Sequence, residues 1–172
     1  MGLKKIKPTQ ILVFSFAFLM IVGTILLNLP ASSKTGESIG LLNALFTATS
    51  AVCVTGLTVV DLHTNFSIFG QLVILILIQI GGLGIMTMAT FIFLVLGKKI
   101  TLRDRLIMQE ALNHLTLSGL VKLTRYILVV ALVLEACGAM VFFIRFTKYF
   151  DIGTSLYYGL FHTVSAFNNS GF

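Results

Sequence analysis

Charged side chains are scarce in this 172-residue chain. They make up 10% of the residues, whereas a soluble domain of ordinary composition carries about 25%. Hydrophobic residues make up 57%. This imbalance excludes a soluble fold and predicts an all-α integral membrane protein. The formal net charge of +6 comes without a basic stripe interleaved with aromatic residues, so it does not indicate nucleic-acid binding.

Cysteine is rarer still, with two residues. Cys53 and Cys137 both lie in apolar stretches without a CxxC partner, and we interpret them as small buried residues rather than parts of a disulfide framework. The histidines His63, His114 and His162 fall in separate segments, so we do not expect them to converge on a metal. The sequence also has no Ser/His/Asp triad, Walker loop or hydrolytic carboxylate pair. We therefore expect no enzymatic activity, no ATP use and no covalent cofactor.

One stretch of the chain occurs twice. Residues 45–57 and 160–172 align without a gap and agree at Leu, Phe, Ser, Ala and Gly; their offset is 115 residues, since 160 minus 45 gives 115. Each copy is a short, apolar, helix-compatible run followed by a few residues that end in glycine. A repeated membrane unit is typical of transporters. A half-helix followed by bent backbone is also how ion filters are built.

The apolar runs predict the order of the elements. Residues 11–29 are long enough to span a bilayer and too long for the core of a signal peptide. Residues 39–51, which Ser38 would cap, are too few to cross, and they predict a re-entrant pore helix; an extracellular helix and loop is the alternative. The predicted first repeat (1–96) has a span at 11–29, a pore helix at 39–51, a filter at 52–57 and a span at 66–96. A cytosolic amphipathic link at 97–125 is followed by an incomplete second repeat (126–172), with a span at 126–146, a pore helix at 155–167 and a filter at 168–172.

Two smaller features complete this prediction. Gly81, Gly82 and Gly84 are expected to pack against the pore helix, since small residues let membrane helices approach closely. Thr154 or Ser155 is expected to cap the second pore helix.

The distribution of basic residues predicts the orientation of the chain in the membrane. Short cytosolic loops carry the excess of Lys and Arg. Three lie before the first span and six in the link, against three in the other loops. The N-terminus and the link are therefore predicted to be cytosolic, so that both filters enter from outside.

Both filters carry a family resemblance. Residues 49–61 (TSAVCVTGLTVVD) resemble the first filter of the Ktr/Trk/HKT potassium transporters, and residues 161–172 (FHTVSAFNNSGF) resemble the second. Residues 79–84 and 97–100 also fit the Ktr branch, so the resemblance covers the whole chain. The family has four such repeats, and this chain is similar to the first one and a half. We expect it to be a piece of a longer protein, because one and a half repeats cannot close a fourfold ring; assembly of several copies is the alternative.

A potassium ion that enters such a filter must exchange its water for other oxygens. Backbone carbonyls bind it without trapping it, and glycine gives the backbone the freedom to turn them inward. We expect one principal site near Gly56 and Gly171. The expected contacts are the backbone carbonyls of Cys53, Val54, Thr55, Gly56, Asn168, Asn169, Ser170 and Gly171.

Two carboxylates are auxiliary candidates. Asp61, just outside the first filter, could raise the local cation concentration; a plain loop carboxylate is the alternative. Glu135 lies inside a span, where an ionisable group is a functional candidate by default. For Glu135 the alternative is a structural pair with a polar group on a neighbouring helix.

The resemblance also implies a function and partners. It implies K+ uptake across a bacterial plasma membrane by the ion-translocating subunit of a Ktr-type system, with Na+ as a coupling or activating ion in many members. It implies a homodimer and a cytosolic KtrA-type regulatory subunit that binds ATP or ADP. The alternative is a non-conducting fragment, remnant or assembly partner of such a transporter.

Overall fold

The computed structural model describes residues 8–84, 87, 106–107, 109 and 120–172. Within this part the chain is helical, without a strand, and Ser33 and Phe66 form an isolated antiparallel bridge. The helices are α1 (Pro8–Leu27), the 3-10 turn η1 (Pro30–Ser32), α2 (Leu41–Val52), α3 (Leu62–Asn65), α4 (Ile68–Leu83), α7 (Leu120–Phe146) and α8 (Ile152–Phe167). Among the described residues, two helices are long and apolar enough to cross a membrane, over Gln10–Leu27 and Val121–Phe146. The described part of the chain is consistent with the all-α membrane protein that the composition predicts.

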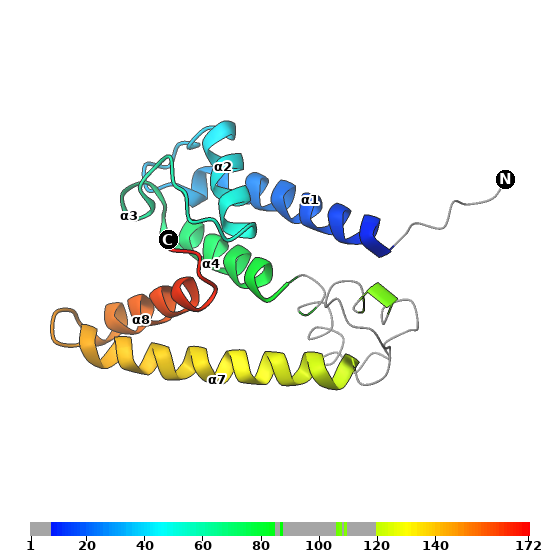
Figure 1. Cartoon of the computed structure of the whole chain (residues 1–172). Helices are drawn as coiled ribbons and strands as arrows, with labels where there is room; N and C mark the ends of the chain where they lie inside the picture. Colours follow the sequence, from blue (N-terminus) through cyan, green and yellow to red (C-terminus); the bar gives the residue numbers. More distant parts are fainter. Residues whose placement is uncertain (1–7, 85–86, 88–105, 108, 110–119) are drawn as a thin grey trace.

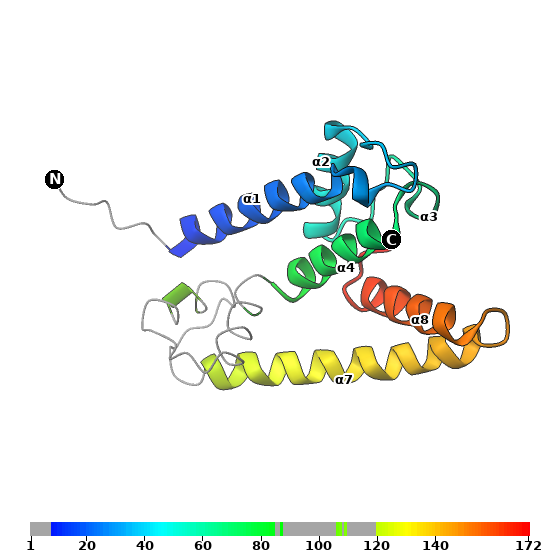
Figure 2. The same ribbon diagram turned by 180° about the vertical axis from the view of Figure 1, so that it is seen from behind.

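Helix α4 lies in the middle of the molecule. Helices α1 and α2 pack together on one side of it, and the antiparallel pair α7 and α8 lies on the other (Figures 1 and 2). The C-terminus lies beside α4, close to the segment that follows α2. The N-terminal ends of α1 and α7 lie at the same end of the molecule as the C-terminal end of α4.

The core is formed where α2 meets α1 and α4. Ala44, Ala48 and Ala51 are fully buried, and their spacing of four and three residues places them along one face of α2. Ile74 and Ile78 of α4 are fully buried in the same cluster. Small residues on α2 let it approach its neighbours closely, which is how membrane helices gain contact area.

Both capping predictions were wrong. Helix α2 begins at Leu41 after Gly40 without a side-chain cap. The hydroxyl of Ser38 instead donates to Oδ1 of Asn28 (2.6 Å) and accepts the backbone N–H of Gly40 (3.1 Å). Helix α8 begins at Ile152, since the carboxylate of Asp151 accepts the backbone N–H of Thr154 (3.1 Å). An aspartate at this position satisfies a free N–H of the first turn.

The long elements also differ in extent from the predicted ranges. Helix α7 begins at Leu120, so residues 120–125 of the predicted link are helical. Helix α4 covers only the first part of the predicted span at 66–96 and ends before Gly84, which has a φ of +83°. Residues 88–96 of that span and most of the link lie outside the described residues.

The prediction that the two cysteines are buried was wrong. Cys53 and Cys137 are both exposed. Cys53 follows the last turn of α2 as its C-cap residue. Cys137 lies on α7 at the spacing that places it with Val133 and Ile144, whose exposed fractions are 54% and 58%.

Candidate ion site

Both candidate filters leave their helices through the same backbone turn. After α2, the N–H of Thr55 donates to the carbonyl of Ser50 (2.9 Å); after α8, the N–H of Ser170 donates to the carbonyl of Ser165 (2.8 Å). The preceding hydrogen bonds in the two turns also match. The N–H of Cys53 donates to the carbonyl of Thr49 (2.9 Å), as that of Asn168 does to Val164 (3.1 Å). The N–H of Val54 donates to the carbonyl of Ala51 (3.2 Å), as that of Asn169 does to Ala166 (3.0 Å). Residues 115 positions apart therefore form the same hydrogen bonds at the C-terminal ends of two helices.

Two residues in each turn have a left-handed backbone. Gly56 and Gly171 have φ values of +69° and +77°, as the sequence predicts for these glycines. Val54 and Asn169 share a φ of +57°, which sequence reasoning missed. Asparagine adopts a left-handed backbone more often than most residues, so Asn169 weakly indicated this conformation. Valine is β-branched and rarely adopts it, so nothing in the sequence indicated it at Val54.

The two candidate filters touch each other. A Cβ atom on Gly56 would overlap the carbonyl oxygen of Ser170 and lie 2.9 Å from its carbonyl carbon. Among the described residues, no atom lies within 4 Å of the same position on Gly171. The contact is therefore head-to-tail: the glycine of the first segment meets the residue before the glycine in the second.

The carbonyl groups of these segments accept no hydrogen bond from the described residues. Within the part of the chain that the structure describes, no hydrogen bond ends on a backbone carbonyl of residues 53–56 or 168–171. Backbone carbonyls are strong acceptors that need a partner once they are removed from water. The helix C-termini from which these segments emerge add partial negative charge. Such an arrangement can bind a cation in place of its water.

Helix α4 supports both segments through two consecutive glycines. A Cβ on Gly81 would overlap the carbonyl oxygen of Val52, the last residue of α2. A Cβ on Gly82 would overlap the side-chain oxygen of Asn168, the first residue after α8. The expected packing of the glycine cluster against the first short helix is confirmed at Gly81. The contact of Gly82 with the second segment was not foreseen.

Glu135 is connected to the second candidate filter. It lies on α7 with 6% of its surface exposed. Nε2 of Gln79, on α4, donates to both carboxylate oxygens, at 2.8 and 3.0 Å. Oε1 of Gln79 accepts a hydrogen bond from Nδ2 of Asn168 at 2.9 Å. Glu135 thus has the polar partner on a neighbouring helix that the sequence offered as an alternative, and this partner leads to a candidate filter residue.

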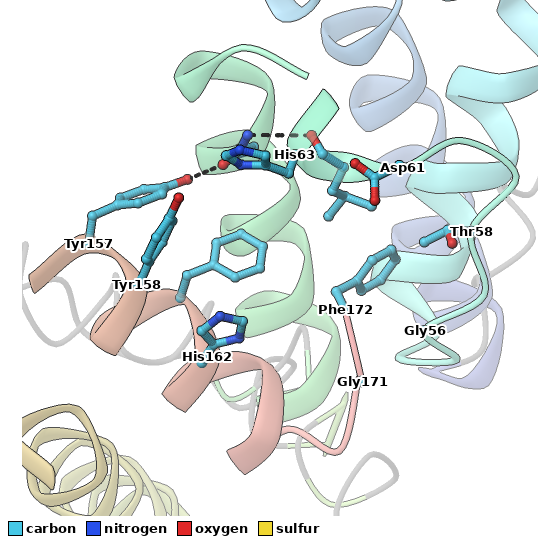
Figure 3. Close-up of a pocket in the computed structure, with 12 residues that line it drawn as sticks. Gly56, Thr58, Asp61, His63, Tyr157, Tyr158, His162, Gly171 and Phe172 are labelled. Atoms are coloured by element: carbon cyan, nitrogen blue, oxygen red, sulfur yellow. Dashed lines mark hydrogen bonds between the residues drawn. The ribbon is translucent and has the colours of Figure 1, made fainter. Parts of the chain in front are cut away.

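Asp61 lies at the N-terminus of α3 and borders a cavity. Its Oδ1 accepts the backbone N–H of Thr64 (2.7 Å) and the Thr64 hydroxyl (2.9 Å). These bonds lower the pKa of Asp61 below its ordinary value of 3.8. The cavity, of about 440 Å³, is also lined by Gly56 and Gly171 (Figure 3). A carboxylate that stays ionised therefore shares one cavity with both filter glycines.

The same cavity contains two histidines that the sequence placed in unrelated segments. His63 of α3 and His162 of α8 both line it. The ring of Tyr158 lies between them, with centroids 6.5 Å from His63 and 6.3 Å from His162 (Figure 3). Among the described residues, no group of three His, Cys, Asp or Glu side chains could hold a metal ion.

Two apolar helices of membrane-spanning length and two short helices with matched C-terminal turns define a helical membrane protein whose candidate site is the internal pair of matched segments. The chain belongs to the TrkH family of cation transport proteins, whose family model matches residues 6–172.

Relatives of the chain are named as potassium uptake proteins. It is 45% identical over 168 residues to Ktr system potassium uptake protein B of Bacillus subtilis, covering 98% of this chain and 37% of that protein. It is 41% identical over 169 residues to the potassium/sodium uptake protein NtpJ of Enterococcus hirae, covering 98% and 38%. Ktr system potassium uptake protein B of Vibrio alginolyticus is 40% identical over 163 residues, covering 95% and 35%. The chain spans a little over a third of the length of these relatives.

Proposed function

We propose that this chain forms part of the ion-translocating subunit of a Ktr-type system and takes part in potassium uptake across a bacterial plasma membrane. The observation that carries the proposal is the contact of two matched turns, at Gly56 and Ser170, whose carbonyls have no donor among the described residues. Potassium uptake in the names of the relatives supports K+ as the ion.

A second packing relationship supports the repeat. A Cβ on Gly23 of α1 would lie 3.2 Å from Cβ of Ala48 on α2, and a Cβ on Gly138 of α7 would lie 2.8 Å from Cγ2 of Thr163 on α8. Both pairs are related by the offset of 115, since 138 minus 23 and 163 minus 48 give 115. We infer that α1 with α2 and α7 with α8 are two copies of one unit, in which α2 and α8 are pore helices.

The ion site follows from the turns. Carbonyls of residues 53–56 and 168–171 replace the water around K+, and the principal site is at the level of Gly56 and Gly171. Head-to-tail contacts such as that of Gly56 with Ser170 close into a ring when the unit is repeated with a rotation that closes. A ring of carbonyls holds a monovalent cation without the deep binding that a ring of carboxylates would give.

Orientation and partners belong to the same proposal. The N-terminal ends of α1 and α7 lie at one end of the molecule (Figure 1). The excess of Lys and Arg before α1 and in the link supports a cytosolic position for that end. A homodimer, a cytosolic KtrA-type subunit that binds ATP or ADP, and Na+ as a coupling ion complete the system. For Na+, support comes from a relative that is named a potassium/sodium uptake protein.

The test is potassium uptake in bacterial cells that lack their own uptake systems. We expect the complete protein that carries these 172 residues to restore growth at low K+ and to take up rubidium, a tracer for K+. Membrane-inserted protein without uptake, with a KtrA-type subunit also expressed, would favour the alternative of a non-conducting fragment, remnant or assembly partner.

A further inference from the structure

We propose that Glu135 is a positioning residue for the second candidate filter and thereby sets the preference of the ion site for K+ over Na+. It acts through Gln79, which holds the side chain of Asn168. This inference rests on the proposed function of residues 168–171 in ion binding.

The hydrogen bonds between the filter and Glu135 share one direction: Asn168 donates to Gln79, and Gln79 donates to Glu135. A carboxylate only accepts hydrogen bonds, so the amide of Gln79 must point its NH2 group at Glu135. The oxygen of the same amide then faces Asn168 and accepts its Nδ2 at 2.9 Å. The orientation of the Asn168 amide is fixed in turn, with its oxygen next to Gly82. Glu135 on α7 thus determines the orientation of the side-chain amides of Gln79 and Asn168.

Asn168 is the point at which this arrangement reaches the backbone. Its Nδ2 also donates to the carbonyl of Val164 at 2.9 Å, which ties the side chain to the last turn of α8. Two residues further on, the carbonyl of Ser170 lies against Gly56 of the first segment. A displacement of Asn168 therefore changes the contact between the two segments at the level of the proposed ion site.

The two segments differ in this support. Cys53 occupies the position of Asn168 in the first segment, and its side chain is exposed. Among the described residues, only the second segment is held to a neighbouring helix by hydrogen bonds of its side chain at this level. Because the amide of Asn168 is bonded to Gln79 of α4 and to the carbonyl of Val164, its contribution is to place the backbone rather than to bind the ion with its amide.

Substitutions at both ends of the connection test the inference in the complete protein. Glu135→Ala and Gln79→Ala each leave Asn168 without its fixed partner. We expect rubidium uptake to become more sensitive to competing Na+, on the order of tenfold, the lower end of the loss seen when outer partners of metal ligands are removed. The double variant is expected to be no more sensitive than the worse single variant, because both act through Asn168.

Two variants separate positioning from other roles. Glu135→Gln keeps an acceptor oxygen at the same reach and is expected to retain the Na+ sensitivity of the parent. Gln71→Ala is the matched control: Gln71 also lies on α4 and joins it to α8, by accepting the hydroxyl of Tyr157 at 2.6 Å, and it lines the cavity beside Gly171, but none of its hydrogen bonds reaches residues 168–171. It is expected to lower the thermal stability of the purified protein without a change in Na+ sensitivity.

The outcomes decide the matter. Unchanged Na+ sensitivity in membrane-inserted Glu135→Ala would overturn the inference while leaving the proposed function intact. Glu135→Gln as impaired as Glu135→Ala would also overturn it, since the effect would then belong to the charge. Absence of uptake by the parent protein would instead contradict the proposed function.

Discussion

Gly81 and Gly82 are neighbours in α4, yet they contact different candidate filters. Gly81 lies against the backbone carbonyl of Val52, and Gly82 lies against the side-chain amide of Asn168. Consecutive residues of a helix point in directions about 100° apart. Helix α4 therefore lies between the two segments and sets their separation. Only glycine, which has no side chain, allows the helix to come so close to both.

This relationship predicts different effects for the same substitution at adjacent positions. Gly81→Ala would force a Cβ into backbone, which cannot yield, so we expect a loss of about 1–3 kcal/mol in stability. Gly82→Ala meets the side chain of Asn168 and would displace it from Gln79, so we expect a loss of stability that is accompanied by a greater sensitivity to Na+. Thermal unfolding in detergent and rubidium uptake measure the two. Equal stability losses with unchanged selectivity would contradict the assignment.

Gly56→Ser tests the proposed ion site. The substitution places a Cβ against the Ser170 carbonyl and a side chain on a residue with a φ of +69°. We expect a weaker preference for potassium over sodium, measured as rubidium uptake with increasing Na+. Gly36→Ser is the matched control, because Gly36 has a φ of +74° but no atom within 4 Å of the added Cβ among the described residues. Unchanged rubidium uptake and sodium sensitivity in Gly56→Ser would contradict the site.

Val54 offers a test of backbone strain. A left-handed backbone costs an ordinary residue about 1–2 kcal/mol, whereas asparagine adopts it more readily. Val54→Asn introduces the residue type found at the corresponding position 169 and should raise the unfolding temperature. The reverse change, Asn169→Val, should lower it. Unfolding temperatures equal to that of the parent in both variants would contradict a left-handed backbone at positions 54 and 169.

Asp61 is expected to act by its charge. Its lowered pKa keeps it ionised down to below pH 3.8, and the stabilising contribution of its cap is lost only as the pH falls through that lowered value. Asp61→Asn should therefore slow rubidium uptake by the same factor across about pH 5–8, and added salt should remove the difference.

The control for Asp61 is Asp151→Asn. Asp151 also caps a helix and also has a lowered pKa, because the backbone and side chain of Thr154 donate to it. It does not line the cavity that Gly56 and Gly171 share with Asp61. Asparagine is a good N-cap at either position. Equal effects of the two substitutions on uptake would show that Asp61 is an ordinary loop carboxylate.

The sequence predicted features that depend on local backbone. Composition and the lengths of the apolar runs were enough for a helical membrane protein, and the left-handed glycines at 56 and 171 are confirmed. Helix ends were less accurate, since Ser38, Ser155 and Asp151 are all capable caps and only the folded loops select among them. The carbonyl contacts of the ion and the partner subunits remain predictions.

The positions of the glycines and the lengths of the apolar runs could be used directly, because each acts within one turn or one span. The offset of 115 residues between the two copies can be read from the chain itself. Three other features join residues that are far apart in sequence. They are the contact of Gly56 with Ser170, the contacts of Gly81 and Gly82 with the two candidate filters, and the connection of Glu135 through Gln79 to Asn168. Partners at such separation are selected by helix packing, which brings one acceptor within about 3 Å of one donor. Sequence alone left Glu135 with two interpretations, and the tertiary structure supplied its partner.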